Sequence, residues 1–108
     1  MIMNIYSIFD DKSVVFSQPF FSISVGSALR SFQNIVNDQS SIVYHHPADF
    51  KLYKVGSFDD SKGILNALVV PEFVASASEY SQKNRNGFVV SESQVSKKDS
   101  NENKSEEN

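Results

Sequence analysis

The stretch Leu52-Tyr53-Lys54-Val55-Gly56-Ser57-Phe58-Asp59-Asp60-Ser61-Lys62 decides the fold, because a shorter copy of it occurs earlier in the chain. The earlier copy is Ile5-Tyr6-Ser7-Ile8-Phe9-Asp10-Asp11-Lys12, and the later copy has Gly56 and Ser57 inserted before its Phe-Asp-Asp. Each copy alternates apolar with other side chains, ends in an Asp-Asp pair and continues into another apolar stretch. This pattern is typical of a β-hairpin. The repeat therefore predicts two hairpins that flank the middle of the chain.

The first hairpin is predicted over residues 2–9 and 14–18, and the second over residues 50–57 and 64–70. Their turns are expected at Asp10-Asp11-Lys12-Ser13 and at Asp59-Asp60, the second closing at Gly63. Asp and Ser favour such turns because their side chains hydrogen-bond to the nearby backbone. Pro19 has no backbone N–H, so the second strand should end there or lie at a sheet edge. The partly charged alternation of the third strand favours a sheet with one face in water.

A helix is predicted between the hairpins, over residues 25–37. Its apolar residues recur every three or four positions and so share one face: Val25, Ala28, Leu29, Phe32, Ile35 and Val36. Ser22 or Ser24 should cap its N-terminus by accepting from free backbone N–H groups. Packed on one face of the sheet, the helix should bury Leu29, Phe32 and Val36.

The C-terminal quarter of the chain has a different composition. Pro71 is expected to open a short helix, with these side chains on one face: Phe73, Val74, Ala77 and Tyr80. Beyond it, residues 82–108 are mostly polar and charged and are predicted to form a disordered tail. The sequence thus predicts one small α+β domain, residues 1–81, built as a hairpin, a helix and a second hairpin on an antiparallel sheet. A core of this size favours self-association or a partner.

Charge and composition exclude several classes of protein. The net charge of the 108 residues is −3, and residues 1–81 account for it with eight acidic and five basic side chains. DNA-binding domains are usually basic, because neutralising phosphates supplies much of their affinity, so this balance argues against a strong autonomous DNA binder. The absence of cysteine excludes disulfides and thiolate chemistry. No apolar run approaches a membrane span and no signal peptide is recognisable, so we expect a soluble, unexported protein.

Two groups of side chains could carry metal or acid–base chemistry. The pairs Asp10-Asp11 and Asp59-Asp60 could bind Mg²⁺, and His45 and His46 precede Asp49 closely enough to form a metal site or an acid–base pair. The interpretation we favour is structural, since both Asp pairs lie at predicted turns and the histidines lie in a Pro-containing connection. Glycine-rich phosphate loops and nucleophile elbows are missing from the sequence. We expect no enzyme activity, no cofactor and no metal.

The strongest indication of binding is the mixture of aromatic and basic residues on the third strand. Lys51, Tyr53 and Lys54 lie together there, with Tyr6 at the matching place in the first hairpin and Arg30 on the helix as a further cation. Aromatic rings on a sheet can stack on unpaired bases while nearby cations attract phosphates. The competing interpretation is that the tyrosines cover a sheet and the lysines keep it soluble.

Four pieces of the sequence occur in an order that resembles a known family. They are Ile5-Tyr6 with Phe9-Asp10, Gln18-Pro19-Phe20, Ala28-Leu29-Arg30-Ser31-Phe32 with Val36-Asn37, and His46-Pro47-Ala48-Asp49-Phe50-Lys51-Leu52-Tyr53 with Gly56 and Phe58-Asp59-Asp60. Together they resemble the small non-structural protein of gokushoviruses, which are single-stranded DNA phages of the microvirus group (Microviridae). The resemblance covers about residues 4–65.

The resemblance implies a DNA-binding regulator in the host cytoplasm. Its role would be the change from duplex replication to the synthesis and packaging of single strands, and no catalytic residues come with it. Single-stranded DNA and a phage replication protein are the implied partners. An adaptor is the alternative, which would bind a replication initiator, a host factor or a capsid precursor without touching DNA.

Overall fold

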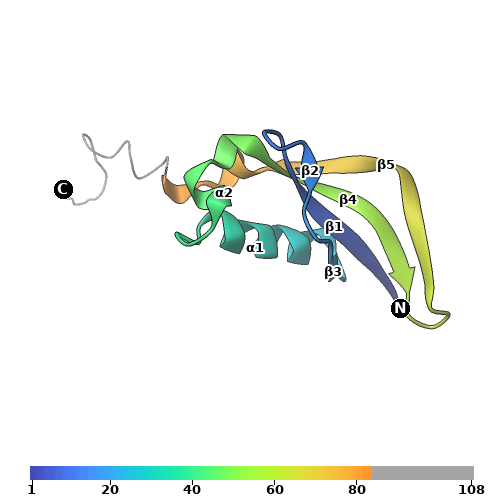
Figure 1. Ribbon diagram of the computed structural model, residues 1–108. Helices are drawn as coiled ribbons and strands as arrows, with labels where there is room; N and C mark the ends of the chain where they lie inside the picture. Colours follow the sequence, from blue (N-terminus) through green and yellow to red (C-terminus); the bar gives the residue numbers. More distant parts are fainter. Residues whose placement is uncertain (84–108) are drawn as a thin grey trace.

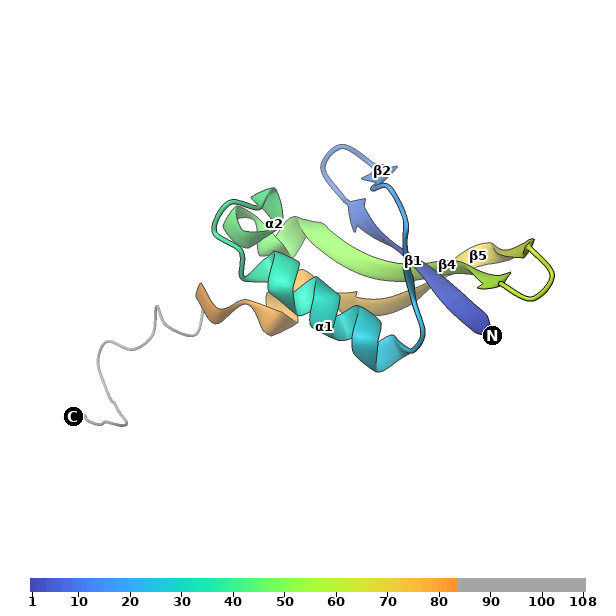
Figure 2. The ribbon, with the colours of Figure 1, turned by 90° about the horizontal axis from the view of Figure 1, so that it is seen from below.

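The computed structural model describes residues 1–83, and these form an α+β domain with one curled antiparallel sheet (Figure 1). In chain order the elements are β1 (Ile2–Asp10), β2 (Val15–Phe16), β3 (Phe20–Ser22), α1 (Val25–Val36), α2 (Ile42–His45), the 3₁₀ turn η1 (Pro47–Asp49), β4 (Phe50–Asp59), β5 (Ile64–Ser76) and the 3₁₀ turn η2 (Ala77–Tyr80). Helix α1 packs along one face of the sheet (Figure 2). The predicted fold class is confirmed.

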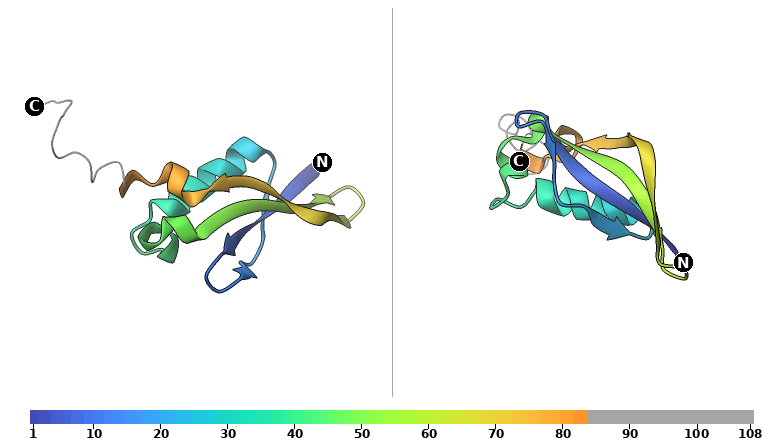
Figure 3. Two further views of the ribbon diagram at one scale, coloured as in Figure 1. Left: turned by 90° about the horizontal axis from the view of Figure 1, so that it is seen from above. Right: turned by 45° about the vertical axis from the view of Figure 1, so that its right-hand side comes forward.

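Strands β1 and β4 lie side by side at the centre of the sheet. The strand order is β2-β1-β4-β5, with β3 also paired to β1, and every pairing is antiparallel. Ser7 lies opposite Tyr53 and Ile8 opposite Leu52, so the two copies of the sequence repeat pair with each other. Figure 3 shows the two strands crossing the middle of the domain, with β5 at one margin. The two predicted hairpins therefore form a single sheet.

The strand predicted over residues 14–18 is shortened to the two residues of β2, along the free side of β1. Pro19 cannot donate to a ladder, and the chain leaves regular pairing just before it. The Ser17 hydroxyl accepts from the Ile8 N–H at 3.0 Å, while the Ser17 N–H donates to the Ile8 carbonyl at 2.8 Å. Pairing resumes at Phe20, opposite Tyr6, which creates the unpredicted strand β3.

Helix α1 follows its prediction closely. Ser24 has an extended backbone and its hydroxyl accepts from the Ser27 N–H at 3.1 Å, so it is the N-cap. Phe32 and Val36 are fully buried as predicted, whereas Leu29 is only partly buried. The core joins these helix residues to the strands β1, β4 and β5, to the connection after α1 and to η2. Its other buried members are Tyr6, Ile8, Ala28, Val43, Phe50, Leu52, Ala75 and Ala77. The short helix α2, capped by Ser41, was not predicted.

The fourth strand is longer than predicted, and the short helix after it begins later. Pro71 does not open a helix, because β5 continues through it to Ser76, and only the turn η2 at residues 77–80 is helical. Opposite the single residue Val55, strand β5 carries residues 68–71, so Pro71 lies in an irregularity on an edge strand. Edge strands and bulges are where a sheet tolerates proline. Beyond the irregularity, Phe73 pairs with Tyr53.

Most of the predicted disordered tail, residues 84–108, lies outside the described residues. Gln82 and Lys83, which precede that part, contact the domain. The Gln82 N–H donates to Oδ1 of Asn37 at 2.9 Å. Lys83 donates to the His45 carbonyl at 3.2 Å, and its ammonium lies 5.1 Å from the centre of the Tyr44 ring. Contacts with the domain therefore continue as far as Lys83.

Truncating Phe32 to alanine should remove most of the stability of the domain. The ring is 0 % exposed and its centroid lies 6.4 Å from that of Tyr80, which packs beside the core. Deleting such a ring leaves a cavity and costs about 3 to 5 kcal/mol, which is a large fraction of the stability of a small domain. Chemical denaturation measures the loss. Phe21→Ala, which truncates a ring that is 50 % exposed, is the control and should cost much less; a Phe32→Ala protein as stable as Phe21→Ala would contradict this view of the core.

Replacing Gly56 by alanine should destabilise the protein although the added group is small. A Cβ there would lie 2.5 Å from the Asn66 carbonyl oxygen, which belongs to the backbone of the paired strand. The clash should cost about 1 to 3 kcal/mol. Gly26→Ala is a control of opposite sign: its Cβ would meet nothing closer than 3.9 Å, and alanine favours a helix over glycine by up to about 1 kcal/mol. Equal melting temperatures for the two variants would show that the close approach is absent.

Candidate functional site

The face of the sheet that points away from α1 carries the candidate site. Successive side chains of a strand point to opposite faces. On β4, Phe50 and Leu52 are buried toward α1, so Lys51 and Tyr53 point to the other face. Their partners on β1 are Phe9 and Ser7. Within residues 1–83, no helix packs on this second face (Figure 3).

Four aromatic side chains, one from each of β1, β2, β4 and β5, form a cluster on this face, which we call the aromatic face: Phe9, Phe16, Tyr53 and Phe73. Tyr53 lies at its centre, with ring centroids 6.1 Å from Phe9, 5.6 Å from Phe16 and 5.9 Å from Phe73. Phe9 and Phe16 are 4.7 Å apart. Phe16 is 40 % exposed and Phe73 55 % exposed, so these two outer rings present the most surface to solvent. The rings around Tyr53 meet edge to face, at 75° to 86°, and together form an apolar patch on this side of the sheet.

One basic side chain lies beside the aromatic face. Lys51 is opposite Phe9 in the sheet register, and its ammonium forms an ion pair with the Asp11 carboxylate in the first turn. This hydrogen bond to Asp11 raises the pKa of Lys51, so the amine stays charged throughout the physiological range. Asp11 balances that charge locally. The aromatic face therefore borders a neutral ion pair and not a free cation.

The structure brings together only two of the side chains that the sequence grouped as a binding site. Lys51 and Tyr53 share the aromatic face. Lys54 points to the other face, where it lines a pocket beside the start of α1 together with Glu72 and with Phe73, one of the four rings. Tyr6 is buried in the core and stacks on Phe20, and Arg30 is exposed on α1. A bulge at Val55 and the antiparallel register, which sets Tyr6 opposite Lys54, explain why the repeat did not reveal these positions.

Sequence reasoning missed three of the four rings. Phe9 is two residues after Ser7 on β1 and so lies on the same face of the sheet as Ser7 and its partner Tyr53. The alternation of the strand could therefore have indicated Phe9. Phe16 and Phe73 reach the cluster only through strand pairings, and the pairing of Phe73 depends on β5 continuing past Pro71. No local pattern in the sequence indicates that continuation.

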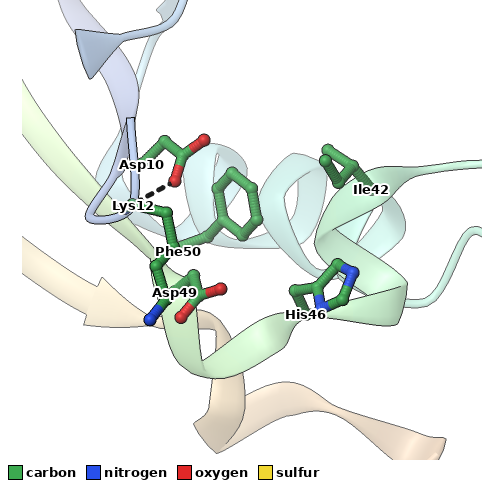
Figure 4. A pocket seen from close by; sticks show the side chains of 6 residues that line it. All are labelled: Asp10, Lys12, Ile42, His46, Asp49 and Phe50. Atoms are coloured by element: carbon green, nitrogen blue, oxygen red, sulfur yellow. Dashed lines mark hydrogen bonds between the residues drawn. The ribbon is translucent and has the colours of Figure 1, made fainter. Parts of the chain in front are cut away.

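Three of the residues proposed for acid–base or metal chemistry, Asp10, His46 and Asp49, line a pocket of about 380 Å³ at the end of β1. His45 lines a different pocket, and its Nε2 is 2.8 Å from the Gln39 carbonyl oxygen. Figure 4 shows Asp10, His46 and Asp49 around the ring of Phe50, from different parts of the chain. The Asp10 carboxylate is already engaged, accepting from the Ser13 hydroxyl at 2.7 Å and the Lys12 N–H at 2.9 Å. The Ser13 hydroxyl lowers the pKa of Asp10. These bonds are those of the predicted turn.

The second Asp pair is also used by its turn. The Asp59 carboxylate accepts from the Ser61 N–H at 2.9 Å, and Gly63 closes the turn with a φ of 70°. The Asp60 carboxylate pairs with the amino group of Met1 at 2.7 Å. Among residues 1–83, no three His, Cys, Asp or Glu side chains are grouped so that they could hold a metal ion. Asp10 and Asp59 therefore bond to their turns as predicted, whereas Asp11 and Asp60 form ion pairs with Lys51 and the Met1 amino group.

These observations define the class of protein: a small α+β domain whose sheet has a core face and a solvent-facing aromatic face. None of the helices in the described part of the chain has the length and apolar character needed to cross a bilayer. The chain belongs to the Phage ORF5 protein family, whose model matches residues 3–80. The match spans both hairpins and α1. No curated protein and no solved structure matches the chain.

Proposed function

We propose that this phage protein is a non-structural regulator that binds single-stranded DNA on its aromatic face. The observation that carries the proposal is the cluster of four rings around Tyr53 on a sheet face that no described helix covers. The gokushovirus resemblance supplies the context, which is the change from duplex replication to single-strand synthesis and packaging in the host cytoplasm. In this role the protein acts by binding and catalyses no reaction.

Single strands suit this surface better than a duplex. Unpaired bases expose their faces, and stacking on an aromatic side chain contributes about 1 to 3 kcal/mol per base. Duplex binding depends instead on cations that neutralise phosphates. The chain has a net charge of −3, and Lys51, the cation beside the rings, is paired with Asp11. We infer an affinity that comes mainly from stacking and falls only weakly with salt.

The alternative is an adaptor that binds a phage replication protein, a host factor or a capsid precursor. Exposed apolar side chains outside the ring cluster favour a protein contact of some kind, above all Val69 and Val70 on β5. The two proposals make different predictions for purified protein. Only the first requires that the chain alone bind an oligonucleotide.

Truncating a ring of the aromatic face should weaken single-strand binding without changing its salt dependence. Tyr53→Ala and Phe73→Ala should each cost about 1 to 3 kcal/mol of binding free energy, because each removes a stacking surface. Lys51→Ala should flatten the log–log salt slope by less than about 0.7, the value for one free phosphate contact on a single strand, because Asp11 already pairs with the ammonium. Fluorescence anisotropy with a labelled oligothymidylate at several salt concentrations measures both quantities.

Matched controls come from the two predicted cations that lie elsewhere. Arg30→Ala removes the same charge as Lys51→Ala from α1 and should change the affinity little, whereas Lys54→Ala removes it from the pocket that Phe73 also lines and should have a smaller effect than Tyr53→Ala. If these variants lose binding as strongly as Tyr53→Ala, the site is not the aromatic face. If the unaltered protein fails to bind at low salt, the adaptor takes the place of the DNA-binding role.

Neutralising Asp11 should strengthen single-strand binding. Asp11→Asn frees the Lys51 ammonium for a phosphate and removes a carboxylate that would repel one. We expect a roughly fivefold tighter Kd at low salt, equivalent to about 1 kcal/mol, and a steeper salt slope. Asp38→Asn makes the same change of net charge in the loop after α1 and is the control. Equal gains from the two variants would mean that total charge matters and the position beside the rings does not.

A further inference from the structure

The outer edge of β5 is an unpaired strand edge with an unusual composition. In the described part of the chain, β5 pairs only with β4. Its first half, residues 64–70, which we call the distal segment, contains no charged residue. Its exposed apolar side chains are Ile64 at 47 %, Leu65 at 66 %, Val69 at 99 % and Val70 at 71 % exposure. The distal segment thus has both an unpaired backbone edge and exposed apolar side chains.

The opposite edge of the sheet is protected in the usual ways. Proteins blunt strand edges with short strands, prolines, bulges or charges, because an open edge is a template for another chain. The strands along β1 have only two residues (β2) and three residues (β3), with Pro19 between them. On β5 such devices begin only at the end of the distal segment, where residues 68–71 form the irregularity that includes Pro71, so residues 64–67 form a regular, unprotected edge. This contrast indicates that the distal segment is covered by a partner in the working protein.

The side chains around the distal segment enlarge the apolar surface. Leu65 lies opposite Phe58, and the Phe58 ring is 5.9 Å from that of Phe21, which is 50 % exposed. The hairpin formed by β4 and β5 projects beyond α1 at this end, so the helix does not bury these residues (Figures 1 and 2). Exposed apolar patches of this kind mark interaction sites.

We propose that the partner is a second copy of this chain, joined by antiparallel pairing of the two distal segments. A twofold interface sets the same surface against itself and must therefore be complementary to itself. A neutral apolar strand meets this condition, since it brings no like charges together. A strongly charged partner would find no opposite charge on residues 64–70. The pairing joins two sheets into one and merges the apolar patches around Leu65 and Phe58.

The joined sheet has a geometric consequence. Adjacent antiparallel strands are related by a twofold axis that is perpendicular to the sheet. Both copies of α1 then lie on one side of the joined sheet, and both aromatic faces lie on the other. The dimer does not depend on DNA binding, and either property can be present without the other.

The association state of the full chain tests the proposal. Analytical ultracentrifugation over a range of concentrations should show a dimer, and Leu65→Glu should raise the dimer Kd at least tenfold by placing two carboxylates in the interface. Leu65 is exposed, so the variant should fold, and circular dichroism checks this directly. Ile42→Glu is the matched control, since Ile42 is 62 % exposed but lies on α2, away from the hairpin. It should leave the dimer intact.

Cysteine cross-linking locates the contact. The chain has no cysteine, so Ala67→Cys introduces a single thiol at the distal segment. A short bismaleimide should join two Ala67→Cys chains efficiently and two Ile42→Cys chains poorly. A monomer at every concentration, or a dimer that Leu65→Glu leaves unchanged, would overturn the proposal. So would a dimer that is lost with Phe88→Asp and kept with Leu65→Glu, which would assign the contact to the apolar run at residues 88–90.

Discussion

The pairing of β1 with β4 is the constraint on which the other features of the domain depend. It runs from Ile2 opposite Asp59 to Asp10 opposite Phe50, and it holds both hairpins in one sheet. Because the side-chain period of a strand is two, this register decides which residues face α1. It sets Ile8 and Leu52 in the core and Ser7 and Tyr53 on the opposite face. A shift by one residue would exchange the core with the aromatic face.

Local patterns in the sequence predicted the secondary-structure elements but not which face of the sheet each side chain lies on. The helical period of residues 25–37, with a serine cap expected at position 22 or 24, predicted α1 almost to the residue. The alternation of the repeat predicted the hairpins, yet it could not show that Tyr6 is buried while Tyr53 is on the open face, because that depends on a register set by distant residues. The length of β5 was missed for a similar reason: Pro71 is compatible with a strand only at an edge, and the edge is defined by the whole sheet.

The domain has three surfaces of different chemical character. One sheet face and α1 form the core, the other sheet face carries the rings, and the outer margin of β5 carries a neutral apolar strand. An acidic total charge is compatible with this plan, because neither stacking nor strand pairing requires many cations. Membership of the Phage ORF5 protein family assigns no chemistry to these surfaces.

The projecting half of the β4–β5 hairpin has little core beneath it. Beyond Leu52 on β4, Gly56 is the only buried residue, and on β5 burial begins at Val74 apart from a partly buried Leu68. Backbone hydrogen bonds that are not covered by buried apolar groups open at a lower free energy than the global one. We therefore expect this end of the sheet to open as a separate unit, so that its amide hydrogens exchange with solvent faster than those around Phe32.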